Sequence, residues 1–409
     1  MLDIELIRKS PEKVAEALKK RNKDDSLLKQ FQNADNAWRE KTQLVEQLRA
    51  EQKKAAAARD KERGTRLKEE VKKIEAELEK LESDRNDLLL EFPNIPFDDV
   101  PMGKDESENV VVKTWGNIPK FDFTPKDHLE LGERLGIIDT QKAAEVAGAR
   151  FYYLKGAGAM LEFALTQFAI ETLTKEEFTP VIPPVMARPD IMRAMGKHRF
   201  IQDDDAFYIQ KDDLYLIGSA EHTLGPLHMQ ETFSETELPK RYVGFSPSFR
   251  REAGSYGRDT RGMFRVHQFD KVEMYSFAHP EKSEEEHRFL LSMQEKLWQA
   301  LEMPYQITAI CTGDMGSTDA RQFDINAWIP SQQTYREVGS CSNTTDYQTR
   351  GMRIKVKGES SMFAHALNAT AIAMSRTIMA ILENNQEEDG SIRIPKALRS
   401  YVGLRRIEK

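Results

Sequence analysis

The segment from residue 26 to residue 91 constrains the fold most, because it contains no proline and a single glycine, Gly64. Its second half places apolar residues at alternating four- and three-residue steps, at Leu67, Val71, Ile74, Leu78, Leu81 and Leu88. Only Arg85 interrupts this seam. The first half repeats the alternation more weakly, at Phe31, Ala34, Trp38, Val45 and Leu48. Because a repeat of 3.5 residues makes two helices wind around each other, the segment predicts an antiparallel coiled-coil arm that turns back at Gly64.

The arm is too long to belong to the core of a compact domain. A helix of about 30 residues extends about 45 Å at 1.5 Å per residue, so the arm should project into solvent. Basic residues gather near its tip and flanks, at Lys53, Lys54, Arg59, Lys61, Arg63, Arg66 and Lys68. The sequence leaves open whether they form an ordinary solvated helix face or contact nucleic-acid phosphates, although projection of the arm favours the phosphates.

The composition is that of a globular protein with more than one domain. The chain has 409 residues, of which 39% are hydrophobic and 31% charged, and a net charge of -7 argues against general coating of nucleic acid. The two cysteines, Cys311 and Cys341, fit neither a disulfide framework nor a zinc site. There is no apolar run of about 18 residues and no signal-peptide pattern at the amino terminus. We therefore expect a cytoplasmic protein without a membrane segment.

The chain changes character after Phe92, where a segment rich in proline and acidic residues indicates a linker. We therefore divide the chain into residues 1–100, helical with the arm at 26–91, and residues 101–409. In the helical part, Ser10 and Pro11 predict the start of a short helix. In the second part, short β-favouring runs occur at 110–115, 150–154, 178–185, 213–219, 242–249, 271–277, 305–311 and 323–329. Helices are expected at 158–175, 281–302 and 366–384. This pattern predicts an α+β domain on an antiparallel sheet.

The densest charged cluster lies between Phe249 and Tyr275 and predicts a hairpin with a glycine-containing loop. Its basic residues are Arg250, Arg251, Arg258, Arg261, Arg265 and Lys271, and they alternate with acidic residues at Glu252, Asp259, Asp270 and Glu273. Guanidinium groups bind phosphate and carboxylate in a bidentate manner, so a polyphosphate ligand is the favoured interpretation. The alternative is a surface lattice of salt bridges.

Two further segments carry residues suited to a nucleotide site. Residues 334–343 place Glu337, Ser340 and Asn343 on a strand-to-turn stretch, which suits Mg²⁺ beside phosphates, although an ordinary strand edge explains the same spacing. Residues 367–376 are expected to open a helix that reaches Arg376. The sequence contains no P-loop pattern that would bind nucleotide instead.

These segments together resemble the seryl-tRNA synthetases, a family of class II aminoacyl-tRNA synthetases. The similarity runs from MLDIELIRKSPEKV at the amino terminus through the arm to three class II motifs. Residues 178–185, with Pro184, resemble motif 1; residues 249–273 resemble motif 2; residues 367–384 resemble motif 3. The resemblance implies the class II antiparallel sheet, ATP-dependent formation of seryl-adenylate and transfer of serine to the 3′ end of tRNA(Ser).

The resemblance also implies an ATP site made of Arg250, Arg251, Glu252, Arg265, Phe269, Glu337, Val338, Gly339, Ser340 and Arg376. Arg250 and Arg376 are the implied catalytic residues. Arg250 holds the α-phosphate and the amino-acid carboxylate, whereas Arg376 covers the adenine and reaches the γ-phosphate. Phe269 stacks on the adenine. The implied Mg²⁺ ligands are Glu337 and Ser340.

Serine would be bound, by the same resemblance, at Ser219, Ala220, Glu221, Arg250, Glu273, Asn368 and Thr370. The tRNA would contact the arm at Lys53, Lys54, Arg59, Arg63 and Arg66. The family also implies a homodimer with motif 1 at the interface.

The chain departs from the family pattern at a few positions. Ser219 stands where the family has threonine, Gly339 where serine is common in bacteria, and Ala369 and Ala371 at usual glycine positions. The first departure removes a methyl group from the amino-acid pocket and bears on serine specificity more than on the chemistry.

Two other functions remain open on the sequence. One is an enzyme that loads a small amino acid onto a carrier protein, and the retained arm counts against it. The other is a non-catalytic RNA-binding derivative, which should have lost the phosphate-binding residues Arg250, Glu337 and Arg376.

Overall fold

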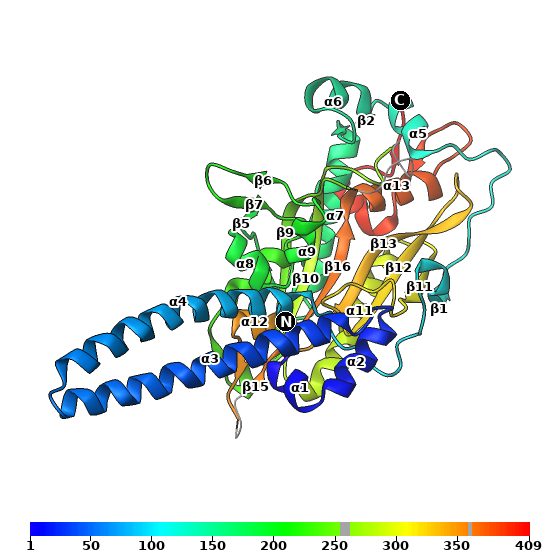
Figure 1. The fold of residues 1–409 in the computed structure, drawn as a ribbon. Coiled ribbons are helices and arrows are strands. Elements are labelled where there is room, and N and C mark those ends of the chain that lie inside the picture. Colours follow the sequence, from blue (N-terminus) through cyan, green and yellow to red (C-terminus); the bar gives the residue numbers. More distant parts are fainter. Residues whose placement is uncertain (254–261, 359–361) are drawn as a thin grey trace. The chain divides into compact units, whose positions relative to one another are not determined.

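The computed structural model describes residues 1–253, 262–358 and 362–409. They form two compact units, Met1–Ile95 and Pro96–Lys409. Figure 1 labels their helices and strands. No helix in the described ranges has both the length and the apolar character that crossing a membrane requires.

The first unit is helical. It consists of α1 (Ile4–Lys9), α2 (Pro11–Lys20), α3 (Ser26–Ala57) and α4 (Lys61–Glu91). As predicted, Ser10 is the N-cap of α2 and Pro11 occupies its first turn, where proline's missing N–H is not needed. The long helices α3 and α4 lie side by side (Figure 1). The buried seam between them is formed by Val45, Leu48, Ala55, Leu67, Val71 and Ile74, which confirms the coiled-coil arm.

The arm turns earlier than the sequence suggests. Helix α3 ends at Ala57 and α4 begins at Lys61, so Gly64 lies inside the first turns of α4 and the prediction that the chain reverses there is wrong. Two residues explain the position of the turn. Arg59 adopts a left-handed conformation with φ of 56°, and the Asp60 carboxylate accepts a hydrogen bond from the backbone N–H of Arg63 at 3.0 Å. An acidic N-cap starts a helix more strongly than one exposed glycine interrupts it.

Arg85 interrupts the seam because it belongs to a buried charge cluster at the base of the arm. Asp35, 3% exposed, accepts hydrogen bonds from Nε and Nη2 of Arg8 at 2.8 and 2.7 Å. Nη1 of Arg85 lies 3.7 Å from the same carboxylate, and its guanidinium lies 4.1 Å from the ring centroid of Trp38. One carboxylate therefore links α1 to both helices of the arm.

The second unit is built on an eight-stranded sheet in the order β1-β11-β12-β13-β16-β10-β9-β4. The strands are β1 (Val110–Trp115), β4 (Thr179–Val181), β9 (Lys240–Phe249), β10 (Gln268–Ala278), β11 (Tyr305–Ala309), β12 (Arg321–Ile329), β13 (Thr334–Asn343) and β16 (His365–Ala373). All neighbours are antiparallel except β4, which runs parallel to β9. The predicted α+β fold on an antiparallel sheet is confirmed.

Three helices share the main core with the sheet: α7 (Ala157–Thr174), α11 (Ser283–Ala300) and α13 (Met374–Asn384). The first two confirm the helices expected at 158–175 and 281–302. On β10, Val272 and Met274 belong to this core, whereas Lys271 and Glu273 alternate with them. Because successive strand residues point to opposite faces, the second face of the sheet is left for polar side chains.

The helix expected at 366–384 is half wrong. Residues 365–373 form β16, which pairs with β10 and β13, and α13 begins only at Met374. β16 is buried on both faces, so it lacks the polar and apolar alternation that identifies a strand. It also contains a β-bulge, because Val272 pairs with Ile372 and Glu273 with Thr370, which leaves Ala371 unpaired against β10.

The remaining elements are short. The helices are η1 (Glu106–Glu108), α5 (His128–Arg134), α6 (Thr140–Ala147), α8 (Pro189–Ala194), α9 (His198–Gln202), α10 (Glu221–Leu224), η2 (Gly225–His228), η3 (Glu235–Glu237), η4 (Pro280–Lys282), α12 (Tyr347–Met352), η5 (Lys396–Leu398) and α14 (Arg399–Val402). The strands are β2 (Ile138–Asp139), β3 (Tyr153–Leu154), β5 (Met186–Ala187), β6 (Tyr208–Ile209), β7 (Leu214–Leu216), β8 (Thr232–Phe233), β14 (Lys355–Val356), β15 (Met362–Phe363), β17 (Ile392–Arg393) and β18 (Arg406–Ile407).

Candidate active site

The predicted charged hairpin is formed by β9 and β10, which pair from Phe249 and Gln268 onward. The arginines of the cluster follow the end of β9 and precede the start of β10. Part of the connecting loop, residues 254–261, lies outside the described residues, and with it Gly254, Gly257, Arg258, Asp259 and Arg261.

Three segments far apart in the sequence meet around one cavity of about 90 Å³, here called the nucleotide cavity. They are the hairpin, the middle of β13 and the junction of β16 with α13. The lining residues are Arg250, Glu252, Phe264, Val266, Phe269, Lys271, Glu337, Val338, Gly339, Ser340, Thr370, Ala373, Ser375 and Arg376. All residues proposed for ATP binding line this cavity except Arg251 and Arg265.

A β-bulge places Glu337 and Ser340 on the same face of β13. Residues three apart on a regular strand point to opposite faces. Here Glu337 pairs with Asn326 and Ser340 pairs with Asp324, and the register shifts between them so that Val338 is the extra residue. Because Asp324 and Asn326 are two apart, their partners share a face. The bulge therefore brings a carboxylate and a hydroxyl to one side.

Arg376, in the first turn of α13, also lines the nucleotide cavity. Its Nη1 lies 3.1 Å from the carboxylate of Glu337 and donates to the Glu337 carbonyl at 3.0 Å. Its Nε donates to the carbonyl of Phe264 at 3.3 Å, and its guanidinium lies 4.5 Å from the Phe264 ring centroid. These contacts fix a planar cation over the cavity.

The acidic side of the cavity is balanced by arginines. Burial raises the pKa of Glu337, but Arg376, Arg250 and Arg265 outweigh burial and leave that pKa below its usual value. For the neighbouring Asp324, burial and the charge of Glu337 together raise the pKa well above its usual range. The two carboxylates thus compete for positive charge.

This donor set fits Mg²⁺. Carboxylate and hydroxyl oxygens are hard ligands, and Glu337 and Ser340 present one of each to the cavity. The described residues hold no group of three or more His, Cys, Asp or Glu side chains suited to a metal ion. A metal ion bound here would therefore take its other ligands from phosphate oxygens or water, as Mg²⁺ commonly does.

The hairpin supplies an arginine directly after β9 and an aromatic ring on β10. Arg250 donates from Nε to the carbonyl of Gly218 at 3.2 Å, and its guanidinium lies 5.5 Å from the ring centroid of Phe269. Glu252 takes a left-handed conformation with φ of 52° and accepts a hydrogen bond from Nη1 of Arg265 at 3.2 Å. Arg265 therefore touches the site through Glu252.

Arg251 lies apart from the nucleotide cavity. Its Nε donates to the carbonyl of Ala206 at 3.2 Å, and its guanidinium lies 4.9 Å from the Phe207 ring centroid. Its expected role in ATP binding stays a prediction, because Arg251 is not among the described residues that line the nucleotide cavity.

A second cavity, of about 250 Å³, shares Ser340 with the nucleotide cavity. Its lining consists of Gly196, Lys197, Arg199, Phe200, Glu221, Gly316, Ser317, Thr318, Asp319, Gln322, Ser340, Ser342 and Asn368. Two residues proposed for serine binding, Glu221 and Asn368, belong to it. The shared serine makes the two cavities neighbours, as a two-substrate reaction requires.

Glu221, the first residue of α10, is a buried charged group in the second cavity. Its carboxylate lies 2.7 Å from Nζ of Lys197 and accepts a hydrogen bond from Nε2 of Gln348 at 2.7 Å. Burial raises the pKa of Glu221, but Lys197 and the other donors outweigh burial and lower it to about 2. The carboxylate is therefore ionised at neutral pH.

Glu273 is linked to the loop before α10. The Ser219 hydroxyl donates to its Oε2 at 3.1 Å, and Nζ of Lys271 lies 2.5 Å from the same oxygen. Thr370 pairs directly with Glu273 across the sheet and lines the nucleotide cavity. Ala220 instead belongs to a neighbouring apolar core and contributes no polar group.

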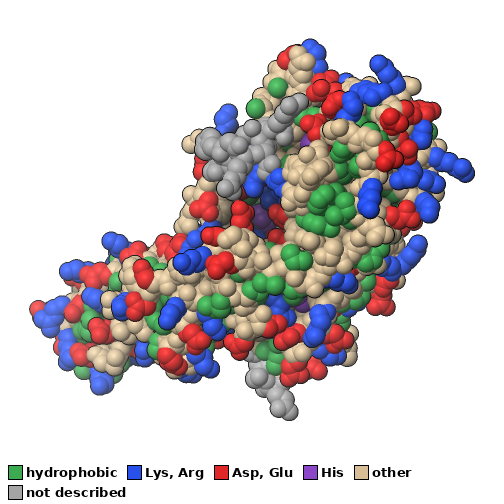
Figure 2. All heavy atoms as spheres, turned by 90° about the vertical axis from the view of Figure 1, so that its right-hand side faces the viewer, with side chains coloured by type: hydrophobic (Ala, Val, Ile, Leu, Met, Phe, Trp, Pro, Cys, Tyr) green, Lys and Arg blue, Asp and Glu red, His purple; other side chains and the backbone are tan. Residues whose placement is uncertain are grey.

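The residues proposed for tRNA binding gather at the tip of the arm in the first unit. Lys53, Lys54, Arg59, Arg63 and Arg66 are all exposed. Only Arg63 among the five has a described ion pair, with Glu51 at 3.0 Å. Figure 2 shows side chains of both charges along the arm. The exposed cations are available to a partner, and their role stays a prediction.

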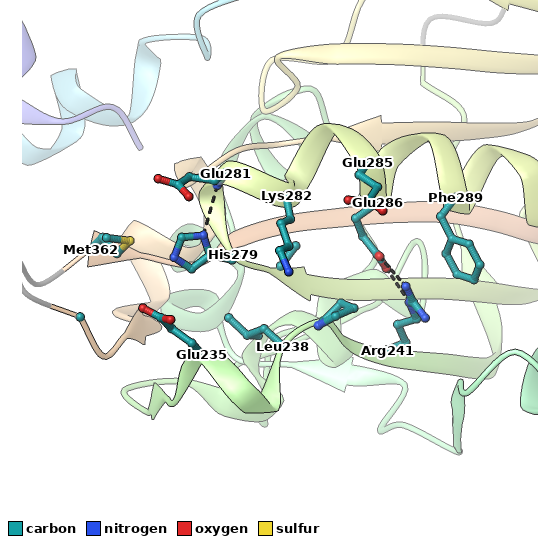
Figure 3. Close-up of a pocket in the computed structure, with 13 residues that line it drawn as sticks. Glu235, Leu238, Arg241, His279, Glu281, Lys282, Glu285, Glu286, Phe289 and Met362 are labelled. Atoms are coloured by element: carbon teal, nitrogen blue, oxygen red, sulfur yellow. Dashed lines mark hydrogen bonds and ion pairs between the residues drawn. The ribbon is translucent and has the colours of Figure 1, made fainter.

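The second unit also contains a larger cavity, of about 610 Å³, whose lining includes none of the predicted site residues (Figure 3). Its lining includes a buried ion pair in which Nε and Nη2 of Arg241 donate to Glu286 at 2.8 and 2.7 Å. Glu286 also accepts a hydrogen bond from the Ser276 hydroxyl at 2.7 Å. Because this pair is already saturated and no predicted site residue lines the cavity, it is not the candidate active site.

Sequence reasoning missed three residues of the site: Lys197, Asp324 and Gln348. Lys197 lies between two short helices in a segment without a recognisable pattern, and Gln348 lies on a one-turn helix. Asp324 occurs in an ordinary β-favouring run. Only the pairing of β12 with β13, which the sequence does not specify, brings Asp324 to Ser340.

The comparisons with known proteins agree with this geometry. The family model described as seryl-tRNA synthetase N-terminal domain matches residues 1–96, and the model for the tRNA synthetase class II core domain (G, H, P, S and T) matches residues 205–385. A serine--tRNA ligase of Thermosipho africanus is 45% identical over 100% of both chains. The chain belongs to the seryl-tRNA synthetases.

Solved structures of other seryl-tRNA synthetases have the same fold. The enzyme of Pyrococcus horikoshii complexed with ATP has a TM-score of 0.92 and 40% identity, over 100% of this chain and 99% of that one. The cytoplasmic enzyme of Naegleria fowleri in complex with AMP has a TM-score of 0.89 and 32% identity over the same shares. The predicted class II synthetase fold with an N-terminal arm is thereby confirmed.

Proposed function

We propose that this chain activates L-serine with ATP to give seryl-adenylate and pyrophosphate, and then transfers serine to the 3′ end of tRNA(Ser). The observation that carries the proposal is the convergence of Arg250, Glu337 and Arg376 on one cavity. That cavity shares Ser340 with a second cavity that contains the ionised Glu221. One site can thus hold a polyphosphate next to an amino acid.

Activation requires that the serine carboxylate attack the α-phosphorus in line with the leaving pyrophosphate. Arg250 is the group suited to hold both reactants, because guanidinium binds phosphate and carboxylate oxygens in a bidentate manner. Positioning and neutralisation of charge supply most of the catalysis in such a transfer. A general base is not required, because the serine carboxylate is already ionised at neutral pH.

The nucleotide is held, in this proposal, between Phe269 and Arg376, with Glu252 facing the adenine. Arg376 also reaches the γ-phosphate. Arg265, whose Nη1 donates to Glu252 at 3.2 Å, also engages the phosphates. Val338 and Gly339 contribute backbone to the cavity wall between Glu337 and Ser340.

Glu337 and Ser340 are the residues that would hold Mg²⁺. The metal, when bound, neutralises charge on the phosphate oxygens and helps to orient them. The absence of a side chain at Gly339, where many bacterial relatives have serine, leaves the backbone of β13 close to Thr370, whose Cβ lies 3.1 Å from where a Cβ of residue 339 would be. A larger residue at this position requires Thr370 to move.

Serine recognition rests on two carboxylates, Glu221 and Glu273, with Ser219, Asn368 and Thr370 around them. A site that hydrogen-bonds the substrate hydroxyl rejects alanine, because its own buried polar groups would then stay unpaired. Rejection of threonine depends on steric closure instead. Ser219 has one methyl group fewer than the threonine of the family, which makes closure at that point looser.

The second step depends on the arm. The exposed cations at its tip suit the phosphate backbone of tRNA(Ser), whose shape is the feature that a helical arm can recognise. We place tRNA binding in residues 1–100 and catalysis in residues 101–409, in keeping with the two compact units that meet at Ile95 and Pro96.

The protein is proposed to act as a homodimer in the cytoplasm. Three large apolar side chains of motif 1 and of the preceding helix α7 are exposed: Met160 and Phe163 on α7, 44% and 65% exposed, and Ile182 of motif 1, 89% exposed. A second copy of the chain would cover them. Both cysteines, Cys311 and Cys341, are buried free thiols, which suits a reducing compartment.

Adenylate formation tests the proposal directly. ATP–pyrophosphate exchange is measured with serine, threonine, alanine and glycine in parallel, and serine should stimulate exchange far more than the others. Exchange that serine does not stimulate would refute the proposal. Charging of tRNA(Ser) then separates this function from loading of a carrier protein, which needs no tRNA.

A further inference from the structure

The two oxygens of the Glu221 carboxylate have different surroundings. Three donors converge on Oε1: Nζ of Lys197 at 2.7 Å, Nε2 of Gln348 at 2.7 Å and Nδ2 of Asn368 at 3.4 Å. No hydrogen bond to Oε2 is found among the described residues, although Glu221 lines the second cavity. One oxygen is thus saturated by the protein and the other is left for a ligand.

The donor from Gln348 has a fixed orientation. The Tyr275 hydroxyl donates to Oε1 of Gln348 at 2.8 Å, so the amide nitrogen of Gln348 must face Glu221. Tyr275 and Gln348 are both fully buried. Since Tyr275 lies on β10 two residues after Glu273, the same strand that carries one serine-binding carboxylate orients the other through Gln348.

Lys197 supplies the positive charge that keeps Glu221 ionised. The other titratable groups around Glu221 are His222 on α10, Asp319, and Lys271 and Tyr275 on β10. Burial and Lys197 lower the pKa of His222 to about 3, so this histidine is neutral at pH 7. Lys197 makes the only ion pair with Glu221 among the described residues.

We propose that Lys197 and Gln348 are positioning residues for amino-acid selection, which hold Oε1 of Glu221 so that Oε2 receives the ammonium group of the substrate. The inference rests on the proposed serine-activating function. An ammonium group needs acceptors, and a carboxylate oxygen with no other donor is the strongest acceptor that the second cavity offers. Without Lys197 the carboxylate would keep only the neutral amide donors of Gln348 and Asn368 and, being buried, would take up a proton more easily.

The decisive variant is Lys197→Met, which keeps the length and apolar stem of the side chain but removes its charge. We expect the KM for serine in pyrophosphate exchange to rise at least about tenfold, while the KM for ATP changes less than about twofold. The KM for serine should also become pH-dependent, rising as the pH falls from about 7.5 to about 5.5, because the pKa of Glu221 moves upward. In the parent protein this KM should stay flat over that interval, because Lys197 and the other donors lower the pKa of Glu221 to about 2.

Two further variants make the outcome unambiguous. Lys197→Arg keeps the charge and should restore a flat pH profile, whereas Gln348→Leu should raise the KM for serine without the pH dependence, because Lys197 still holds Glu221 ionised. Lys296→Met is the matched control, since Lys296 pairs with Glu176 on the surface away from both cavities. It should leave both KM values unchanged.

Thermal melts establish that each variant is folded. The proposal is overturned if folded Lys197→Met keeps the parent KM for serine and a flat pH profile, or if its KM values for serine and ATP rise together. A parent protein that shows no serine-stimulated exchange refutes the proposed function instead, before any variant is compared.

Discussion

Replacement of Arg376 by alanine should weaken the use of ATP far more than the use of serine. In the structure its guanidinium is held by Glu337 at 3.1 Å and by two backbone carbonyls at 3.0 and 3.3 Å, and its side chain is only 17% exposed. A charge-assisted hydrogen bond in such a place contributes about 1.5–3 kcal/mol. Two such bonds to phosphate together correspond to about 3–6 kcal/mol, a loss of roughly 10² to 10⁴ in kcat/KM for ATP.

The assay is pyrophosphate exchange with ATP varied at saturating serine, then serine varied at saturating ATP. Arg336→Ala is the matched control, because its guanidinium lies 4.0 Å from the ring centroid of the same Phe264 but does not line the nucleotide cavity. The reasoning is refuted if Arg336→Ala lowers kcat/KM for ATP as much as Arg376→Ala. The effect would then come from packing of Phe264 and not from contact with the nucleotide. Arg376→Lys should recover about one of the two bonds, or roughly a factor of ten to a hundred.

Other consequences concern the arm and the stability of the fold. Joint replacement of Lys54, Arg59 and Arg66 by glutamine should weaken tRNA charging and leave pyrophosphate exchange intact. The slope of log affinity for tRNA against log salt concentration should fall by about one unit for each phosphate that the arm no longer neutralises. Equal impairment of both activities would contradict the separate role of the arm. Asp35→Ala should destabilise the first unit by about 3 kcal/mol in urea unfolding, because it removes the buried carboxylate that faces the buried guanidinium of Arg85 and the partly exposed one of Arg8. An unchanged midpoint would contradict this. Burial lowers the pKa of His287 from 6.5 to about 4, so the unfolded chain takes up this proton more readily than the folded one. The stability that neutral His287 contributes is therefore complete above about pH 6.5 and is lost as the pH falls towards 4. His287→Gln should flatten the slope of unfolding free energy in that interval, and a slope equal to that of the parent would contradict the assignment.

The parts of the fold that the sequence predicts are those with a strong local pattern. The seam of the arm is recognisable because the same apolar period persists over many turns, and it survives in the structure at Leu67, Val71 and Ile74. The sequence misplaces the turn of the arm because a glycine is visible in a sequence, whereas the left-handed Arg59 and the capping Asp60 are recognised only once the helix ends are known.

The error in the helix expected at 366–384 has a physical cause in the bulge of β16. In a regular strand every second side chain points to the same face. Because Ala371 is unpaired, the side chains on the face with the two cavities are Asn368, Thr370 and then Ala373, at spacings of two and three. Spacings of two and three in a wholly buried segment look helical. The sequence carries no signal that separates a helix from a bulged strand here.

The candidate site was predictable where single residues are matched to the chemistry of phosphate and carboxylate, as at Arg250 and Arg376. It was not predictable where the role depends on a neighbour. Lys197 and Gln348 become informative only when their distances to Oε1 of Glu221 are known. Asp324 becomes informative only through its register opposite Ser340.

The unpaired Ala371 also determines where this segment can change in length. Deleting Ala371 would leave Ile372 opposite Val272 and Ala373 opposite Lys271, so the strand would become regular without moving Arg376. Deleting a residue between Ala373 and Arg376 would instead turn the Arg376 side chain about its helix by roughly 100°, away from Glu337 and the nucleotide cavity. We expect related chains to differ in length at the bulge but to keep the number of residues between Ala373 and Arg376 constant.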